Sequence, residues 1–116
     1  MVLYHNDTGV TQALVSSLSR EVRLVCVASA CPEIRPAIIR SRADVLILDL
    51  ETSCLDEVEK LHSEFPDLSI VCTHRLADEE LWAQALRQGA VDMCEPRRTD
   101  DVVRSVLSER AHHAAA

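Results

Sequence analysis

Five short apolar runs divide this chain, and longer segments with a helical spacing of apolar residues lie between them. The runs are rich in Val, Ile and Leu, as expected of strands that are buried on both faces of a sheet. They are VLYH (2–5), RLVCVA (23–28), DVLILD (44–49), LSIVCT (68–73) and VDMC (91–94). Strands that alternate with helices from end to end imply a parallel sheet with right-handed crossover connections. This alternation limits the chain to an α/β architecture.

The ends of the expected helices agree with this division. The segment DEELWAQALRQG (78–89) opens on three acidic residues, which favour the N-terminus of a helix, and closes on Gly89, a residue typical of the position after a helix end. The helix near 32–42 is harder to bound, because Pro32 and Pro36 both fall in or near it and an internal proline removes a hydrogen bond.

We therefore predict a single three-layer (βα)5 domain of the flavodoxin-like class, with a parallel five-stranded sheet in the order 2-1-3-4-5. With 116 residues, 47% of them hydrophobic, the chain is long enough to bury one core. The domain is expected to span residues 1–110, and residues 111–116 (AHHAAA) are expected to be a tail or the start of a linker.

Charge and composition exclude several function classes. Nineteen acidic residues against twelve Lys and Arg give a formal net charge of −7, which repels nucleic acids and anionic membranes. No apolar stretch approaches the roughly 20 residues that cross a bilayer, and the N-terminus lacks a signal-peptide pattern. The five cysteines form no C-x-x-C pair, so a disulfide framework or a zinc site has little support. We expect a cytoplasmic protein that binds neither DNA nor a membrane directly.

Polar residues close three of the five expected strands. Asn6 and Asp7 follow the first, Asp49 ends the third and Thr73 ends the fourth. Taken alone, an Asp at such a place is also common where a strand turns out of the core. In an open parallel sheet, however, ligands collect at the carboxyl ends of the central strands. Two carboxylates that meet there repel each other unless a hard cation such as Mg²⁺ lies between them, so Asp7 and Asp49 are predicted to form a magnesium site.

A carboxylate held near Mg²⁺ can also attack a phosphoryl group and form an acyl phosphate. His5 and His74 flank the same strand ends. Because no third ligand lies at a defensible spacing, we interpret both histidines as structural or exposed.

From about Val2 to Leu107 the chain resembles the receiver domains of bacterial two-component response regulators. The resemblance depends on the order and spacing of VLYHND, ADVLILDLETSCLDEVEKL, LSIVCT and ALRQGAVDMCEP. It implies that Asp49 stands at the phosphoacceptor position and that Thr73 contacts the phosphoryl group.

The resemblance also implies a metal site. Asn6 and Asp7 match the acidic pair that holds Mg²⁺ in the family, together with Asp49 and the backbone carbonyl of Glu51. Because Asn6 replaces one of the two acids, we expect this Mg²⁺ site to be weak.

Several other positions depart from the family pattern. The family's Lys-Pro after the fifth strand is replaced by Glu95 and Pro96 with one residue fewer, and Lys60 is the only lysine of the chain. Met93 stands roughly where the family has an aromatic residue, and Thr52, Ser53 and Glu57 replace the usual Met-Pro and Gly after the phosphoacceptor. Arg97 or Arg98 could supply a substitute cation or could simply belong to a solvated turn.

Three functions remain open on these residues. The chain is an atypical receiver whose output depends on protein–protein interaction, a fully active Mg²⁺-dependent receiver that accepts phosphoryl on Asp49, or a flavodoxin-like domain that binds a small ligand. The missing lysine favours the first, since phosphoryl transfer depends on cations that neutralise the transferred oxygens. No Gly-rich phosphate loop follows any strand, which disfavours the third. In neither of the first two functions does the chain act as an enzyme on a separate substrate.

The expected partners follow from the resemblance. They are a histidine kinase or another signalling protein, an output domain beyond the C-terminus, and a second copy of the chain that docks through the fourth helix, fifth strand and fifth helix. Trp82 on the fourth helix is a candidate anchor, although a core position is an equal alternative.

Overall fold

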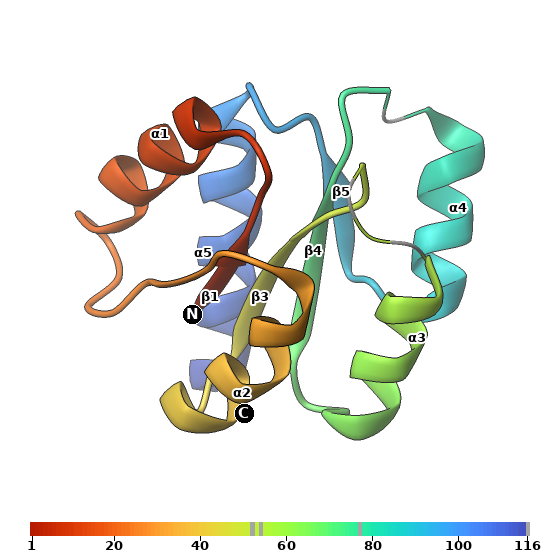
Figure 1. Cartoon of the computed structure of the whole chain (residues 1–116), viewed down its shortest axis with the longest axis horizontal. Helices are drawn as coiled ribbons and strands as arrows, with labels where there is room; N and C mark the ends of the chain where they lie inside the picture. Colours follow the sequence, from red (N-terminus) through yellow and green to blue (C-terminus); the bar gives the residue numbers. More distant parts are fainter. Residues whose placement is uncertain (52, 54, 77, 116) are drawn as a thin grey trace.

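The protein is a five-stranded parallel sheet with helices on both faces (Figure 1). The computed structural model describes residues 1–51, 53, 55–76 and 78–115, so Thr52 and Cys54 lie outside the described residues. The strand order is β2-β1-β3-β4-β5, which confirms the predicted fold class and order. The strands are β1 (Val2–Tyr4), β2 (Cys26–Ala28), β3 (Val45–Asp49), β4 (Ser69–Thr73) and β5 (Asp92–Cys94).

Five helices cover the sheet in two layers. They are α1 (Thr8–Leu18), α2 (Cys31–Ser41), α3 (Leu55–Glu64), α4 (Glu79–Gln88) and α5 (Thr99–Ala115). Buried residues of α2, α3 and α4 pack into one hydrophobic cluster, and those of α1 and α5 pack into the other. No helix of the described ranges is both long and apolar enough to cross a membrane. The domain boundary at residue 110 stays a prediction, although α5 continues to Ala115.

The central strand β3 sends its side chains alternately into these two clusters. Leu46 and Leu48 pack with α2, α3 and α4, whereas Val45 and Ile47 pack with α1 and α5. All five residues of β3 are buried, which explains their unbroken apolar sequence. By the same alternation Asp49, the last residue, lies on the α1 and α5 face.

Helix α2 shows how the chain accommodates two prolines. The helix spans Cys31–Ser41, so Pro32 falls in the first turn, where a missing N–H costs nothing. Pro36 lies inside the helix. The Glu33 carboxylate accepts hydrogen bonds from the backbone N–H of Ser29 (2.7 Å) and of Ala30 (3.1 Å), which fixes the start of the helix. The predicted segment near 32–42 was therefore correct in kind and displaced by one residue.

The four cysteines among the described residues are free, and two of them are buried. Desolvation raises the pKa of the Cys72 thiol to about 12 and that of the Cys94 thiol to about 11. Both thiols therefore stay protonated in the folded protein at pH values where an exposed thiol ionises.

We expect the stability of the fold to decrease above pH 9.0, the ordinary thiol pKa. The unfolded chain then loses thiol protons that the folded chain keeps, so the free energy of unfolding falls by about 1.4 kcal/mol per pH unit for each thiol. Urea unfolding of the parent and of Cys72→Val, measured on both sides of that pH, should show the smaller decrease in the variant. Equal decreases would mean that Cys72 ionises normally in the folded state.

Candidate functional site

Asp49 is a buried carboxylate at the carboxyl end of the central strand. The residue is 1% exposed. Its Oδ1 accepts a hydrogen bond from the backbone N–H of Glu51 at 3.0 Å. The Ser53 hydroxyl and N–H donate to the Asp49 carbonyl oxygen at 2.8 and 3.2 Å, which closes the turn after β3. This turn holds Asp49 in a defined position at the point where β3 ends.

Thr73 lies beside Asp49 on the neighbouring strand. The two residues are paired in the parallel register of β3 and β4, so the structure brings these two predicted site residues together. Thr73 is fully buried, and its Oγ1 has no hydrogen-bond partner among the residues that the structure describes. Its hydroxyl is therefore available to a group bound at Asp49.

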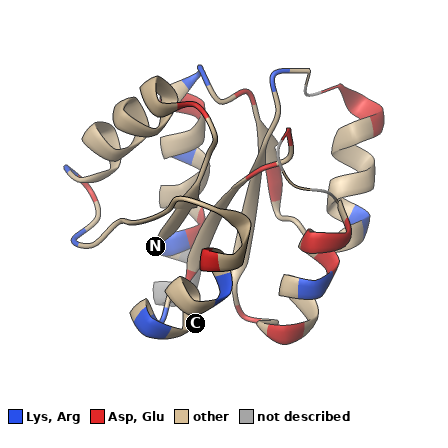
Figure 2. Ribbon diagram, viewed as in Figure 1, with Lys and Arg blue, Asp and Glu red and all other residues tan. Residues whose placement is uncertain are grey.

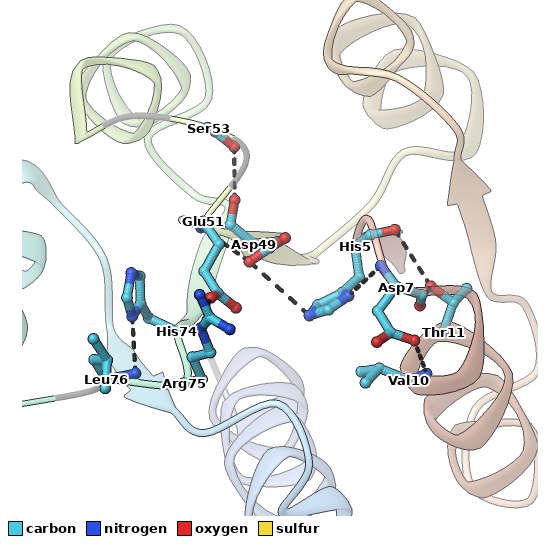
Figure 3. Close-up of polar contacts among 10 residues, drawn as sticks. All are labelled: His5, Asp7, Val10, Thr11, Asp49, Glu51, Ser53, His74, Arg75 and Leu76. Carbon is cyan, nitrogen blue, oxygen red and sulfur yellow. Dashed lines mark hydrogen bonds and ion pairs between the residues drawn. The ribbon is translucent and has the colours of Figure 1, made fainter.

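His5, which flanks the same strand ends in the sequence, lies on the other side of Asp49. Its side chain is 4% exposed, and its Nε2 is 4.0 Å from Asp49 Oδ1 (Figure 3). The backbone N–H of Asp7 donates to His5 Nδ1 at 3.0 Å, so Nδ1 is the acceptor and Nε2 carries the ring proton. The register of the strands could have indicated this position. Tyr4 of β1 pairs with Leu48 of β3, so the residues that follow them, His5 and Asp49, lie next to each other.

Asp7 caps the helix that follows β1. It is the N-cap of α1, and its Oδ1 accepts a hydrogen bond from Val10 N–H at 3.1 Å. That bond lowers the pKa of the Asp7 carboxyl below its ordinary value, and the charge of Arg97 acts in the same direction. Asp7 and Asn6 are both exposed. In Figure 3 the Asp7 carboxylate points to the start of α1, so a magnesium site shared by Asp7 and Asp49 stays a prediction.

Arg75, which follows β4, forms an ion pair with Glu51, a residue of the turn after Asp49. Its Nε lies 2.6 Å from Oε1 of Glu51, whose side chain is 24% exposed. Arg98, in contrast, pairs with Glu95 and Asp101, both at 3.6 Å. The turn after β5 thus holds an ion pair where the receiver family has its lysine.

His5, Asp49 and Glu51 form a small cluster whose ligand-type atoms all lie within 4.8 Å of one another. The cluster is acidic, but its donors fit Mg²⁺ poorly, because Mg²⁺ prefers oxygen ligands in octahedral geometry. The Glu51 carboxylate is bound by Arg75, and His5 presents an N–H to the site. The cluster as it stands is therefore a poor site for Mg²⁺.

The fold of the chain is similar to that of several solved structures. No protein-family model matches the sequence, and no curated protein matches it significantly. Among solved structures, a response regulator from Thermotoga maritima superposes with a TM-score of 0.83 at 21% identity, covering 93% of this chain and 94% of that chain. The receiver domain of NtrX from Brucella abortus superposes with a TM-score of 0.82 at 18% identity, covering 93% and 95%.

A third similar structure is described as an atypical orphan response regulator with a phosphorylation-independent regulatory mechanism. It superposes with a TM-score of 0.82 at 13% identity, covering 93% of this chain and 92% of that chain. These likenesses show that the chain has the receiver fold.

The cap role of Asp7 leads to a test. We expect Asp7→Ala to lower the urea midpoint of unfolding, because α1 loses its N-cap hydrogen bond, and Asp7→Ser to restore most of the loss, because serine also caps helices. Both differences should be the same with and without Mg²⁺. A loss that appears only when Mg²⁺ is present would instead identify Asp7 as a metal ligand.

Proposed function

We propose that this chain, which has the fold of response regulator receiver domains, is an atypical receiver-like signalling domain of two-component phosphorelay signal transduction. Asp49 stands at its phosphoacceptor position. The observation that carries the proposal is the buried Asp49 carboxylate at the end of the central strand, in register with Thr73. In open parallel sheets this is the place where ligands bind and chemistry occurs.

Three features support an atypical member whose output depends on protein–protein interaction. The lysine after the fifth strand is missing. Asp49 is almost inaccessible to a phosphoryl donor, with 1% of its surface exposed. Glu51, in the turn after Asp49, forms an ion pair with Arg75, so this cation is already engaged. In this proposal Mg²⁺ binds weakly, and the chain does not act as an enzyme on a separate substrate.

A fully active Mg²⁺-dependent receiver is the second candidate. The Thr73 hydroxyl beside Asp49 has no hydrogen-bond partner among the described residues, and this favours the second candidate. A buried hydroxyl without a partner is costly, and a phosphoryl oxygen would satisfy it. The two candidates differ in how fast Asp49 accepts phosphoryl.

The partners that we propose are proteins. Trp82 on α4 is 45% exposed, Leu86 is 44% exposed and Val91, before β5, is 39% exposed. These apolar side chains make α4, β5 and α5 the proposed contact surface for a histidine kinase, another signalling protein or a second copy of the chain, with Trp82 as the anchor. An output domain beyond the C-terminus is also proposed, since this chain covers only 27% of a longer NtrX structure from Brucella abortus.

Charge argues against nucleic acid and membrane partners. Acidic segments occupy α3 and the start of α4, whereas basic segments are scattered (Figure 2). The net charge of −7 repels phosphates, so the proposed domain binds neither nucleic acid nor an anionic membrane directly. A cytoplasmic location is proposed with it.

We expect low millimolar Mg²⁺ to stabilise the fold by less than about 0.4 kcal/mol, the value for a ligand at a concentration equal to its dissociation constant. Thermal unfolding in chelator and in Mg²⁺ measures the difference, and Asp49→Asn is the control for binding elsewhere. A large stabilisation that Asp49→Asn abolishes would favour the fully active receiver.

The rate of labelling by acetyl phosphate tests the proposed function. In the presence of Mg²⁺ we expect slow labelling of the parent at Asp49, read from the mass of the intact protein, and none in Asp49→Asn. Inserting a lysine between Glu95 and Pro96 should accelerate labelling about tenfold or more, because one well-placed charge stabilises the transition state by roughly 2–4 kcal/mol. Fast labelling of the parent would contradict the atypical assignment.

A further inference from the structure

Two buried polar atoms flank Asp49, and neither has a hydrogen-bond partner within the described part of the chain. They are Nε2 of His5, from the end of β1, and Oγ1 of Thr73, from the end of β4. Buried polar groups in native proteins are nearly always paired, so each exception needs an explanation. The receiver resemblance accounts for Thr73, but it offers no role for His5.

The proton of His5 has a defined position. Asp7 N–H can only donate, so His5 Nδ1 must accept, and the neutral ring carries its proton on Nε2. Figure 3 shows the ring lying between the Asp7 segment and Asp49, with Nε2 on the Asp49 side. The distance of 4.0 Å between Nε2 and Asp49 Oδ1 is too long for a hydrogen bond. The N–H therefore points into the site without reaching the carboxylate itself.

We infer that His5 takes the place of the divalent cation at this site: its Nε2–H donates to an oxygen of a phosphoryl group on Asp49, so that the acyl phosphate forms and is held without Mg²⁺. This inference depends on the proposed position of Asp49 as the phosphoacceptor. Oxygens of the phosphoryl group then accept a hydrogen bond from His5 Nε2–H on one side and from the Thr73 hydroxyl on the other. Donors in a water-excluded site are worth more than the same donors in water.

The transfer balances without a metal or an added proton. An oxygen of the Asp49 carboxylate attacks the phosphorus of a small acyl phosphate. A new P–O bond to Asp49 forms, the P–O bond to the donor breaks, and the donor carboxylate leaves with the electron pair. His5 keeps its Nε2 proton throughout and contributes a hydrogen bond.

The same tautomer argues against metal binding by His5. Imidazole binds a metal through the lone pair of an unprotonated nitrogen. Freeing Nε2 would move the proton to Nδ1, where it would face the N–H of Asp7 and replace a hydrogen bond by two opposed donors. The geometry of the His5, Asp49 and Glu51 cluster is thus better suited to an oxyanion on Asp49 than to a cation.

Labelling by acetyl phosphate in a buffer freed of divalent cations tests this inference. We expect the parent to be labelled at Asp49 at a rate within roughly twofold of that in Mg²⁺, and His5→Ala to lose about 10²-fold, as when one oxyanion donor is removed. His5→Gln, whose side-chain amide also donates, should recover much of the rate. His5→Asp should make labelling dependent on Mg²⁺, because two carboxylates then recruit the cation.

His74→Ala is the matched control. His74 Nδ1 also accepts a hydrogen bond from the backbone N–H two residues later, Leu76, at 2.9 Å, but the contact is exposed. This variant should be labelled like the parent. It separates the loss of a hydrogen-bond donor to the phosphoryl group from the loss of a local histidine–backbone contact.

Three labelling outcomes would overturn the inference. Labelling of the parent only in Mg²⁺ would do so while keeping Asp49 as the phosphoacceptor, and undiminished labelling of folded His5→Ala would do the same. Absence of labelling in both buffers would overturn it and leave a domain that works by protein interaction alone. A further measurement needs no His5 variant. ¹⁹F NMR of the parent with beryllofluoride in the absence of Mg²⁺ should show a bound signal that Asp49→Asn lacks. Absence of this signal in the parent would also overturn the inference.

Discussion

The burial of the Asp49 carboxylate is the constraint on which the proposed site depends. Removing a carboxylate from water is costly unless hydrogen bonds or opposite charges compensate it. The backbone N–H of Glu51 donates to this carboxylate within the tight turn that Ser53 closes after β3. His5, directly after β1, and Thr73, at the end of β4, lie on either side of the carboxylate, so polar groups surround it at the edge of an otherwise apolar sheet.

Much of this arrangement follows from the sequence because it depends on periodicity and register. The continuous apolar run of β3 identifies a central strand, and in a parallel sheet the ends of neighbouring strands meet at one edge. Asp49 and Thr73 could therefore be predicted to lie together, and they do. Gly89 was likewise identified as a helix end, and it adopts φ 114° there, a conformation that glycine tolerates best.

The orientations of Asp7 and His5 could not be predicted in the same way, because both residues lie where β1 has ended and α1 begins. There the N-terminus of α1 competes for the Asp7 carboxylate and binds it through Val10 N–H. The Asp7 backbone N–H in turn donates to His5 Nδ1 and fixes the ring of His5 beside Asp49. Arg75 was also not predicted, since its partner Glu51 comes from a different turn and only the fold brings the two together.

The departures from the receiver pattern change the balance of charge at the candidate site. Ordinary receivers, by the resemblance, balance three acidic side chains against Mg²⁺ and a lysine. Here Asn6 has lost one charge, Asp7 caps a helix, and Glu51 is neutralised by Arg75. Fewer acidic groups therefore face the candidate site than in the family pattern, and the cation that the family's lysine would supply is missing as well. In a site with less charge of both signs, hydrogen-bond donors contribute a larger share of the contacts to a bound oxyanion. This is the role inferred above for His5 Nε2–H beside the Thr73 hydroxyl.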